Sequence, residues 1–204
     1  MTTNVANATT KEFLNLDKRI QEWFAENAPE LMTKSTGPSQ VFSQISSRDV
    51  PAMLKGTGLA LIGISFIILL VIRNVKYGLM SLIPNLLPAA IAFGLWGYYT
   101  GAVTLAVSIV VAMTLGIVVD DSVHFMLKYA KARKKGKSPE DSVREAFQKV
   151  GMALTTTTIG LFLGFCVLAQ SGFAVNKDMA QLTAITVVFA LVVDYILLPS
   201  ILIW

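Results

Sequence analysis

Five long apolar segments, joined by short polar links, make up most of the chain after residue 55. They run over about 56–72, 77–99, 102–127, 150–170 and 179–203. A helix rises about 1.5 Å per residue, so each segment can cross a hydrocarbon core of about 30 Å, the first of them only just. The pattern therefore predicts an all-α membrane protein with five transmembrane helices in residues 55–204.

Residues 1–54 are polar and mixed in charge, in contrast to the segments that follow. An amphipathic helix that Pro29 ends is indicated by apolar residues at three- and four-residue steps: Phe13, Leu16, Ile20 and Trp23. Glu30–Thr36 is consistent with a short strand, and a second, weaker amphipathic helix begins near Val41. We expect a small external α/β remnant, too short to bury a good core alone.

The composition agrees with a membrane protein. Hydrophobic residues make up 54% of the 204 residues and charged residues 15%, against about 25% in ordinary soluble domains. The single cysteine, Cys166, lies inside an apolar segment, so a disulfide framework is excluded. Met1–Thr10 is polar and lacks the regions of a signal peptide. We expect no metal, no cofactor and no enzymatic activity.

The net charge of +4 comes mainly from one link between the apolar segments. Residues 128–149 contain eight Lys and Arg residues, and Arg73 and Lys76 lie in the first link, whereas the last link contains only Lys177. The positive-inside rule then places the N-terminus outside and the C-terminus in the cytoplasm. We expect a multi-pass protein of a bacterial inner membrane, whose basic link contacts lipid headgroups and not nucleic acid.

A short helix is predicted near 138–149, on the cytoplasmic surface of the membrane. Ser138 is suited to the cap position, Pro139 to the first helical position, and two acidic residues follow. An apolar stripe along this helix consists of Val143, Ala146, Phe147 and Val150. A stripe of this kind favours a helix that lies on the bilayer.

The third apolar segment contains a ridge of small or polar residues at four-residue steps. These residues are Thr104, Ser108, Ala112, Gly116, Asp120 and His124, and Asp121 follows directly after Asp120. An ionised Asp near a bilayer centre costs about 2.5–3.5 kcal/mol on insertion scales. Small residues let helices approach closely. We therefore predict that the ridge points Asp120 into the helix bundle.

Two further segments show the same kind of face. The fourth contains Thr155, Thr156, Gly160 and Gly164, and the fifth contains Thr186, Ala190 and Asp194. Counting residues from the segment ends places Asp120 and Asp194 within about one helical turn of the same depth. We predict a proton relay formed by Asp120, Asp121, His124 and Asp194, supported by Gly116 and by Thr155, Thr156, Gly160 and Gly164. The alternatives are a hydrogen-bonding structural role for Asp194, an interfacial His124, and threonines that bond their own helix.

The second segment contains Pro84 and Pro88, four residues apart, around Asn85. Proline removes a backbone donor and favours a kink. The two prolines are either a hinge beside the relay or a static bend shaped for packing.

Several of these motifs occur together in one order. They are Gly78–Pro88, Leu115–Phe125, the cytoplasmic helix, Gly160, Gly164 and Asp194–Pro199. This order resembles the resistance–nodulation–division (RND) transporter superfamily, in particular its branch of lipid and hydrophobic-compound exporters, the MMPL, hopanoid-exporter and Patched-like group. The resemblance covers roughly residues 35–204.

In that superfamily each half has a first helix, an external porter domain and five further helices. The resemblance implies that this chain is the end of a porter domain and the last five helices of one half. It also implies that Asp120, and with it Asp121, belongs to the proton-relay site on the fourth helix of that half. We expect the half's first helix and the whole partner half to lie outside this chain.

We interpret the chain as the C-terminal membrane part of an exporter of lipids or hydrophobic compounds that the proton motive force drives. Its expected partners are membrane lipids, a hydrophobic substrate, and the remainder of the transporter or oligomeric copies. The alternatives are a sterol-sensing-like lipid-binding regulatory module and an inactive truncated fragment. An intramembrane aspartyl protease that uses Asp120 and Asp194 is disfavoured, because Asp194 lacks the Gly-x-Gly-Asp context.

Overall fold

The computed structural model describes residues 10–72, 82–100 and 105–204, and the chain divides into two compact units, 1–52 and 53–204. We describe each unit by itself. Parts of three sequence predictions fall outside the described residues: the basic link 73–76, the start of the second apolar segment, and Thr104.

The N-terminal unit consists of helices in its described part. Helix α1 (Thr10–Asn27) is followed by the 3-10 helix η1 (Pro29–Leu31) and by the start of α2 (Pro38–Ile72). Asp17 on α1 accepts hydrogen bonds from Ser35 Oγ and, at 2.8 Å, from Gln40 Nε2. These bonds hold the start of α2 against α1 within the unit.

The α/β character predicted for residues 1–54 is not confirmed. Pro29–Leu31 forms a 3-10 helix, and no strand occurs in the described residues of this unit, 10–52. The apolar residues Leu31 and Met32 are exposed and have no second strand against which to pair. A single extended segment leaves its backbone donors and acceptors unpaired, so the sequence pattern alone did not produce a strand.

Helix α2 also differs from the prediction, which separated an amphipathic helix from the first apolar segment. The structure has one continuous helix of 35 residues through Pro51. A proline inside a helix removes one backbone donor and favours a bend, but it does not end the helix here. Within the C-terminal unit, Ile64 of α2 packs against the core.

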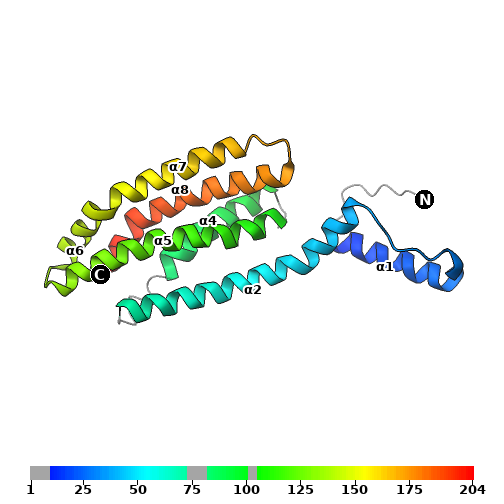
Figure 1. Ribbon diagram of the computed structural model, residues 1–204, viewed down its shortest axis with the longest axis horizontal. Coiled ribbons are helices and arrows are strands. Elements are labelled where there is room, and N and C mark those ends of the chain that lie inside the picture. Colours follow the sequence, from blue (N-terminus) through cyan, green and yellow to red (C-terminus); the bar gives the residue numbers. More distant parts are fainter. Residues whose placement is uncertain (1–9, 73–81, 101–104) are drawn as a thin grey trace. The chain divides into compact units, whose positions relative to one another are not determined.

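The C-terminal unit is a bundle of long helices. Its elements are α4 (Leu82–Thr100), α5 (Leu105–Lys134), α6 (Pro139–Ala146), the π-helical turn η2 (Phe147–Gly151), α7 (Met152–Leu168) and α8 (Ala174–Ile203). Helix α8 contacts α4, α5 and α7, and it lies between α7 and the other two helices (Figure 1). The side chains of α8 therefore form most of the bundle's centre.

Four stretches of the described chain are long and apolar enough to cross a membrane. They are Pro38–Ile67, Val107–Lys134, Pro139–Leu168 and Ala174–Ile203. Four of the five predicted spans thus have a counterpart, and the second predicted span, about 77–99, is not confirmed. The described part of α4 is only 19 residues long and includes two prolines and an asparagine, and the first residues of that predicted span lie outside the description.

Helices α5 and α8 run parallel with a constant register. Ser122 bonds to Asp194 and Tyr129 to Leu202, pairs that are 72 and 73 positions apart. Val110 and Leu182 belong to one apolar cluster and are 72 positions apart as well. This register gives the depth at which each residue of α5 meets α8.

Two apolar clusters lie at different depths along this pair of helices. One includes Phe125, Met126, Tyr129 and Leu198 together with residues of α6, η2 and α7. The other consists of Ala92, Val107, Val110 and Leu182. Tyr129 Oη donates a 2.7 Å hydrogen bond to Leu202 O, so the buried phenol has a partner.

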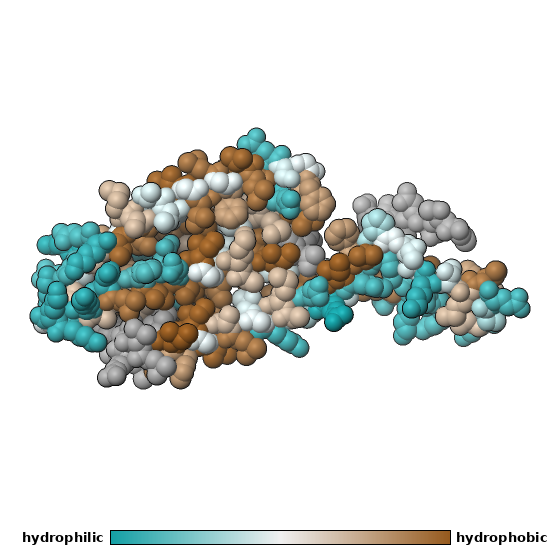
Figure 2. Space-filling model, in the orientation of Figure 1, coloured by the Kyte–Doolittle hydropathy of each residue, from teal (hydrophilic) through white to brown (hydrophobic). Residues whose placement is uncertain are grey.

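A helix near 138–149 is present as α6 with its continuation in η2, and its predicted place on the membrane surface stays a prediction. Ser138 Oγ accepts from Asp141 N at 3.1 Å, and Pro139 is the first helical residue. The predicted stripe packs inward, with Val143, Ala146 and Val150 buried. Figure 2 shows hydrophilic residues gathered at the α6 end of the bundle and hydrophobic residues along its sides, as expected for a membrane bundle.

Candidate functional site

Asp194 is the buried acid of the bundle, with 2% of its surface exposed. It accepts a 2.8 Å hydrogen bond from Ser122 Oγ, and Ser122 is fully buried on α5. Among the described residues no cation pairs with Asp194. A carboxyl group in such a place has lost water and gained one hydroxyl partner, so its ionised form is costly. The hydrogen-bonding role that the sequence left open for Asp194 is thus present, and its part in a proton relay stays a prediction.

The other three predicted relay residues lie beside this bond on α5. Asp121 is half-buried and directly follows Asp120 on α5. Asp120 Oδ1 and His124 Nε2 lie 3.3 Å apart, a contact that is an ion pair only when the imidazole is protonated, and the two side chains are 72% and 58% exposed. The predicted similarity in depth is confirmed, because Ser122, two residues after Asp120, bonds to Asp194. Of the three acids, Asp194 is therefore buried, Asp121 is half-buried and Asp120 is exposed.

The prediction that the ridge of α5 points into this bundle is wrong for its described part. Ala112, Gly116, Asp120 and His124 are exposed in the C-terminal unit, and only Ser108 of the ridge is buried. The buried face consists instead of Val110, Thr114, Val118 and Ser122, again at four-residue steps. Both faces contain small or polar residues, so residue size alone did not distinguish them. The register between α5 and α8 distinguishes the two faces.

The three glycines that were expected to support packing make no close approach in this unit. A Cβ atom added to Gly116, Gly160 or Gly164 would meet nothing within 4 Å. Each lies on an exposed position of its helix. A packing role for them therefore requires another part of the transporter or another chain, and it stays a prediction.

Thr155 and Thr156 on α7 bond to their own helix, the alternative that the sequence left open. Thr156 Oγ1 donates to Met152 O at 2.8 Å, and Thr155 Oγ1 donates to Gly151 O at 3.0 Å. Thr155 Oγ1 also lies 2.7 Å from Tyr195 Oη on α8. Only Thr155 therefore has a side-chain partner on another helix.

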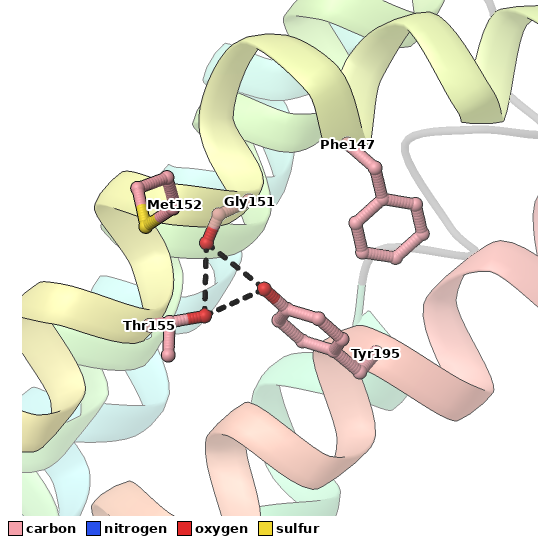
Figure 3. Close-up of a pocket in the computed structure, with 5 residues that line it drawn as sticks. All are labelled: Phe147, Gly151, Met152, Thr155 and Tyr195. Carbon is pink, nitrogen blue, oxygen red and sulfur yellow. Dashed lines mark hydrogen bonds between the residues drawn. The ribbon is translucent and has the colours of Figure 1, made fainter.

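The π-helical turn η2 opens a shallow hollow on the bundle, with a volume of about 610 Å³. It is lined by Phe147, Gly151, Met152, Thr155 and Tyr195. Tyr195 Oη also lies 2.9 Å from Gly151 O, so the two hydroxyl groups and this carbonyl are all within hydrogen-bond distance of one another (Figure 3). Their two hydrogens can serve two of the three contacts at a time. In a π turn each backbone hydrogen bond spans one residue more than in an α-helix. The contacts with Thr155 and Tyr195 hold Gly151 O, the carbonyl at the end of η2, in place.

Pro84 and Pro88, the predicted hinge, both lie on the buried face of α4. The helix continues through Pro88, and Asn85 between them is 1% exposed. The structure thus places the prolines inside the bundle, and their movement stays a prediction.

The described residues contain no group of three or more His, Cys, Asp or Glu side chains that could hold a metal ion. The polar side chains of the bundle interior are instead mostly neutral. Thr114, Ser122, Thr183 and Thr186 are fully buried, and Asp194 nearly so.

Sequence reasoning missed Ser122, Tyr195 and Gly151. Ser122 had a signal, since it continues the four-residue steps of Val110, Thr114 and Val118. Tyr195 had none, because its partner lies 44 positions away across a π turn that the sequence pattern does not indicate.

Comparison with known proteins identifies the family. The chain matches the MMPL family over residues 4–204. A protein of Methanocaldococcus jannaschii, whose name says only that it is a membrane protein, is 23% identical over 189 residues, which are 93% of this chain and 48% of that protein. The chain thus spans about half the length of this curated relative. The resemblance to the MMPL branch of RND transporters is confirmed, and the chain belongs to the MMPL family.

Proposed function

We propose that this chain is the C-terminal membrane part of an RND-type exporter of lipids or other hydrophobic compounds, driven by the proton motive force. The observation that supports the proposal most is the buried Asp194, bonded to Ser122 beside Asp120 and Asp121. Acids held inside a membrane bundle are costly to keep and occur mainly in ion or proton pathways. Family membership supports transport as the general role.

The proposed mechanism is proton exchange along the acids of α5 and α8. The Asp120–His124 pair receives or releases the proton at the surface of α5, and the half-buried Asp121 passes it on toward Asp194. One proton that crosses 100 mV yields about 2.3 kcal/mol. This free energy is enough to shift the population of a helix bundle whose two states differ by a few kcal/mol.

The exposed face of α5 is part of the proposal. A carboxyl and an imidazole group such as those of Asp120 and His124 are poorly suited to contact with lipid tails, so protein or water must cover them. The same face contains Ala112 and Gly116, which allow close contact with another helix. We expect the remainder of the transporter, or a second copy of the chain, to cover this face, consistent with the share of the curated relative that the chain matches.

In this proposal all five apolar segments span the bacterial inner membrane. The basic link after α5 and the helix α6 lie in the cytoplasm, the N-terminal unit lies outside, and the C-terminus is cytoplasmic. Support comes from the concentration of Lys and Arg at the α6 end of the bundle. Cysteine labelling of positions in α6 and α1 from either side of the membrane tests this orientation.

The proposed function is tested by export of a hydrophobic compound from cells that express the intact transporter with Asp120→Asn, Asp121→Asn or Asp194→Asn. We expect each variant to lose export by about tenfold or more, because the neutral amide cannot take up and release a proton. Glu140→Gln, an exposed change on α6, is the matched control and should retain export.

Correct folding of the variants is checked by their amount in the membrane and their elution as a single species. Export retained by all three variants would defeat the relay. Retained binding of lipid together with no export in the unchanged protein would favour the sterol-sensing-like regulatory module instead.

A further inference from the structure

Asn85 is a buried polar side chain without a described partner. It lies on α4 with 1% of its surface exposed, and neither its Oδ1 nor its Nδ2 atom forms a hydrogen bond. A primary amide can donate two hydrogen bonds and accept two. Nearly all buried amides in proteins have partners, so an amide with none requires an explanation.

The backbone next to Asn85 adds another open acceptor. In an α-helix the N–H of residue 88 donates to the carbonyl of residue 84, but Pro88 has no N–H. Pro84 and Pro88 are both buried. The buried face of α4 therefore holds a carbonyl without its helical donor beside an amide without a partner, within one turn.

The depth of Asn85 follows from the packing of α4. Ala92 packs in one cluster with Val110 and Leu182. The link between α4 and α5 is only four residues long, so the two helices run antiparallel. Asn85 is seven residues before Ala92, so it lies about 10 Å from that cluster, on the side of the acids.

Two sets of polar side chains on α5 and α8 lie on either side of the depth of Asn85, a threonine level and an acid level. The threonine level consists of Thr114 and Thr186, which are 72 positions apart and therefore lie at the same depth in the register of α5 and α8. This level is about 6 Å from the cluster of Val110 and Leu182, on the side of the acids. The acid level, Ser122 and Asp194, is about 18 Å from the same cluster. Asn85 at about 10 Å lies between the two levels.

The threonines at the first level can accept hydrogen bonds but have used their donors. Thr114 Oγ1 donates to Val110 O at 2.7 Å, and Thr186 Oγ1 donates to Leu182 O at 2.8 Å. A molecule that joins them to Asn85 must therefore donate as well as accept. Water does both, and it carries no charge into a region where the nearby groups are neutral.

Both amide atoms are fully buried, so no water-sized space adjoins them in this conformation. We propose that Asn85 is a hydration site that opens when α4 separates from α5 and α8, with water then joining its amide to the threonine level on one side and to the acid level on the other. The two prolines on the same face make α4 the helix most suited to move. The unpaired amide makes the closed conformation less stable and so favours opening.

This inference does not rest on the proposed function, because a bundle without transport activity would still contain the unpaired amide. It does add a polar connection that proton exchange requires if it extends beyond Asp194. The proposal gives Asn85 a role of its own, the binding of water, that is separate from a bend of α4 at Pro84 and Pro88.

The test measures the rate at which silver ions, which are about the size of water, modify single cysteines in the full chain in lipid nanodiscs. The only native cysteine is first removed by Cys166→Ser. Thr186→Cys probes the hydrated level, and Leu182→Cys, one turn away on the same helix and equally buried, is the matched control. We expect Thr186→Cys to react at least about tenfold faster than Leu182→Cys, since opening admits water only to the first position.

A second variant links this reactivity to Asn85. Asn85→Leu keeps the size of the side chain and removes its polar atoms, so we expect Thr186→Cys to become as slow as Leu182→Cys. Equal rates for the two cysteines with Asn85 present would overturn the proposal. Fast modification of Thr186→Cys that persists with Asn85→Leu would overturn it too, because water would then enter without the amide.

Discussion

At the scale of single residues, the hydrogen bond between Ser122 and Asp194 joins the two helices that carry the acids. Both residues are almost completely buried, and the bond crosses 72 positions of sequence. A buried acceptor that loses its donor is destabilising. Ser122 therefore holds Asp194 in place as well as stabilising the bundle.

We predict that Ser122→Ala lowers the free energy of unfolding by about 1–3 kcal/mol, because the Asp194 carboxyl keeps no replacement for the lost donor. Ser200→Ala is the control, since Ser200 is exposed and bonds only to Ile196 O of its own helix. Unfolding of the chain in mixed detergent micelles, followed by circular dichroism, gives both values. Equal stability of the two variants would contradict a strong Ser122–Asp194 bond.

The sequence predicted Asp120, Asp121 and Asp194 as notable because charge is rare in apolar segments, an argument that needs no structure. It did not predict which face of α5 is buried, because Gly116 and Asp120 on one face alternate with Thr114 and Ser122 on the other. The distinction depends on the register between α5 and α8, a tertiary property.

At the scale of elements, the π turn η2 joins helix α6 to helix α7 without a break. Its last carbonyl, Gly151 O, accepts hydrogen bonds from Thr155 and Tyr195. Phe147 packs on Phe125 and Tyr195, with ring centroids 4.8 and 5.0 Å apart. These contacts fix where α6 ends and α7 begins.

We predict that Tyr195→Phe loosens this junction while leaving the rest of the bundle intact, because the aromatic packing remains and one hydrogen bond to Gly151 O is lost. Amide hydrogen exchange should rise about fivefold or more over residues 147–155, as expected for a loss of about 1 kcal/mol. Tyr98→Phe, at an exposed position of α4, is the control. Unchanged exchange over 147–155 would show that Thr155 alone holds the turn.

Glu145 links the start of α6 to its end. It pairs with Lys137 at 2.8 Å and with Lys149. The hydrogen bond and the charge of Glu145 raise the pKa of Lys137 above its ordinary value. The fold thus favours the charged form of Lys137, and this preference contributes to the stability of the folded protein. The contribution is complete at neutral pH and is lost only as the pH rises through the raised pKa.

We predict that Glu145→Gln lowers the pKa of Lys137, because the amide carries no charge to stabilise the ammonium group. Nitrogen-15 NMR of the lysine side chains during an alkaline titration measures the change. Glu140→Gln, on the same helix, should leave the titration as it is in the unchanged protein. A pKa of Lys137 that stays the same in Glu145→Gln would contradict the ion pair.

The elements differ in how far the sequence predicted them. The start of α6 follows from local chemistry, since Ser138 and Pro139 satisfy the first turn without other parts of the protein. The strand at Glu30–Thr36 did not form, because a strand depends on a partner that this chain does not supply in its described part. The continuation of α2 through Pro51 shows that one proline did not determine a boundary.

At the scale of the whole molecule, the bundle's interior between two apolar clusters contains both polar and apolar side chains. Ser122, Thr186 and Asp194 are buried there, and so are Val118 and Val187. The cluster around Phe125 and Leu198 lies on one side of the acids, and the cluster of Val110 and Leu182 lies on the other. A polar level enclosed in this way has little contact with bulk water, so protons can enter it only along specific side chains or admitted water. In the proposed relay, the exposed Asp120–His124 pair is one such entrance on the face of α5.

The central claim is that these acids exchange protons inside the membrane bundle. Infrared difference spectroscopy of the intact transporter in nanodiscs, with carbon-13 label in aspartate, follows the carbonyl band of protonated carboxyl groups as the pH changes. We predict a titrating aspartate band that loses intensity in Asp121→Asn and in Asp194→Asn, and that Asp141→Asn, at the exposed start of α6, leaves unchanged. A band that is absent, or that both interior variants leave unaltered, would contradict proton exchange at this site.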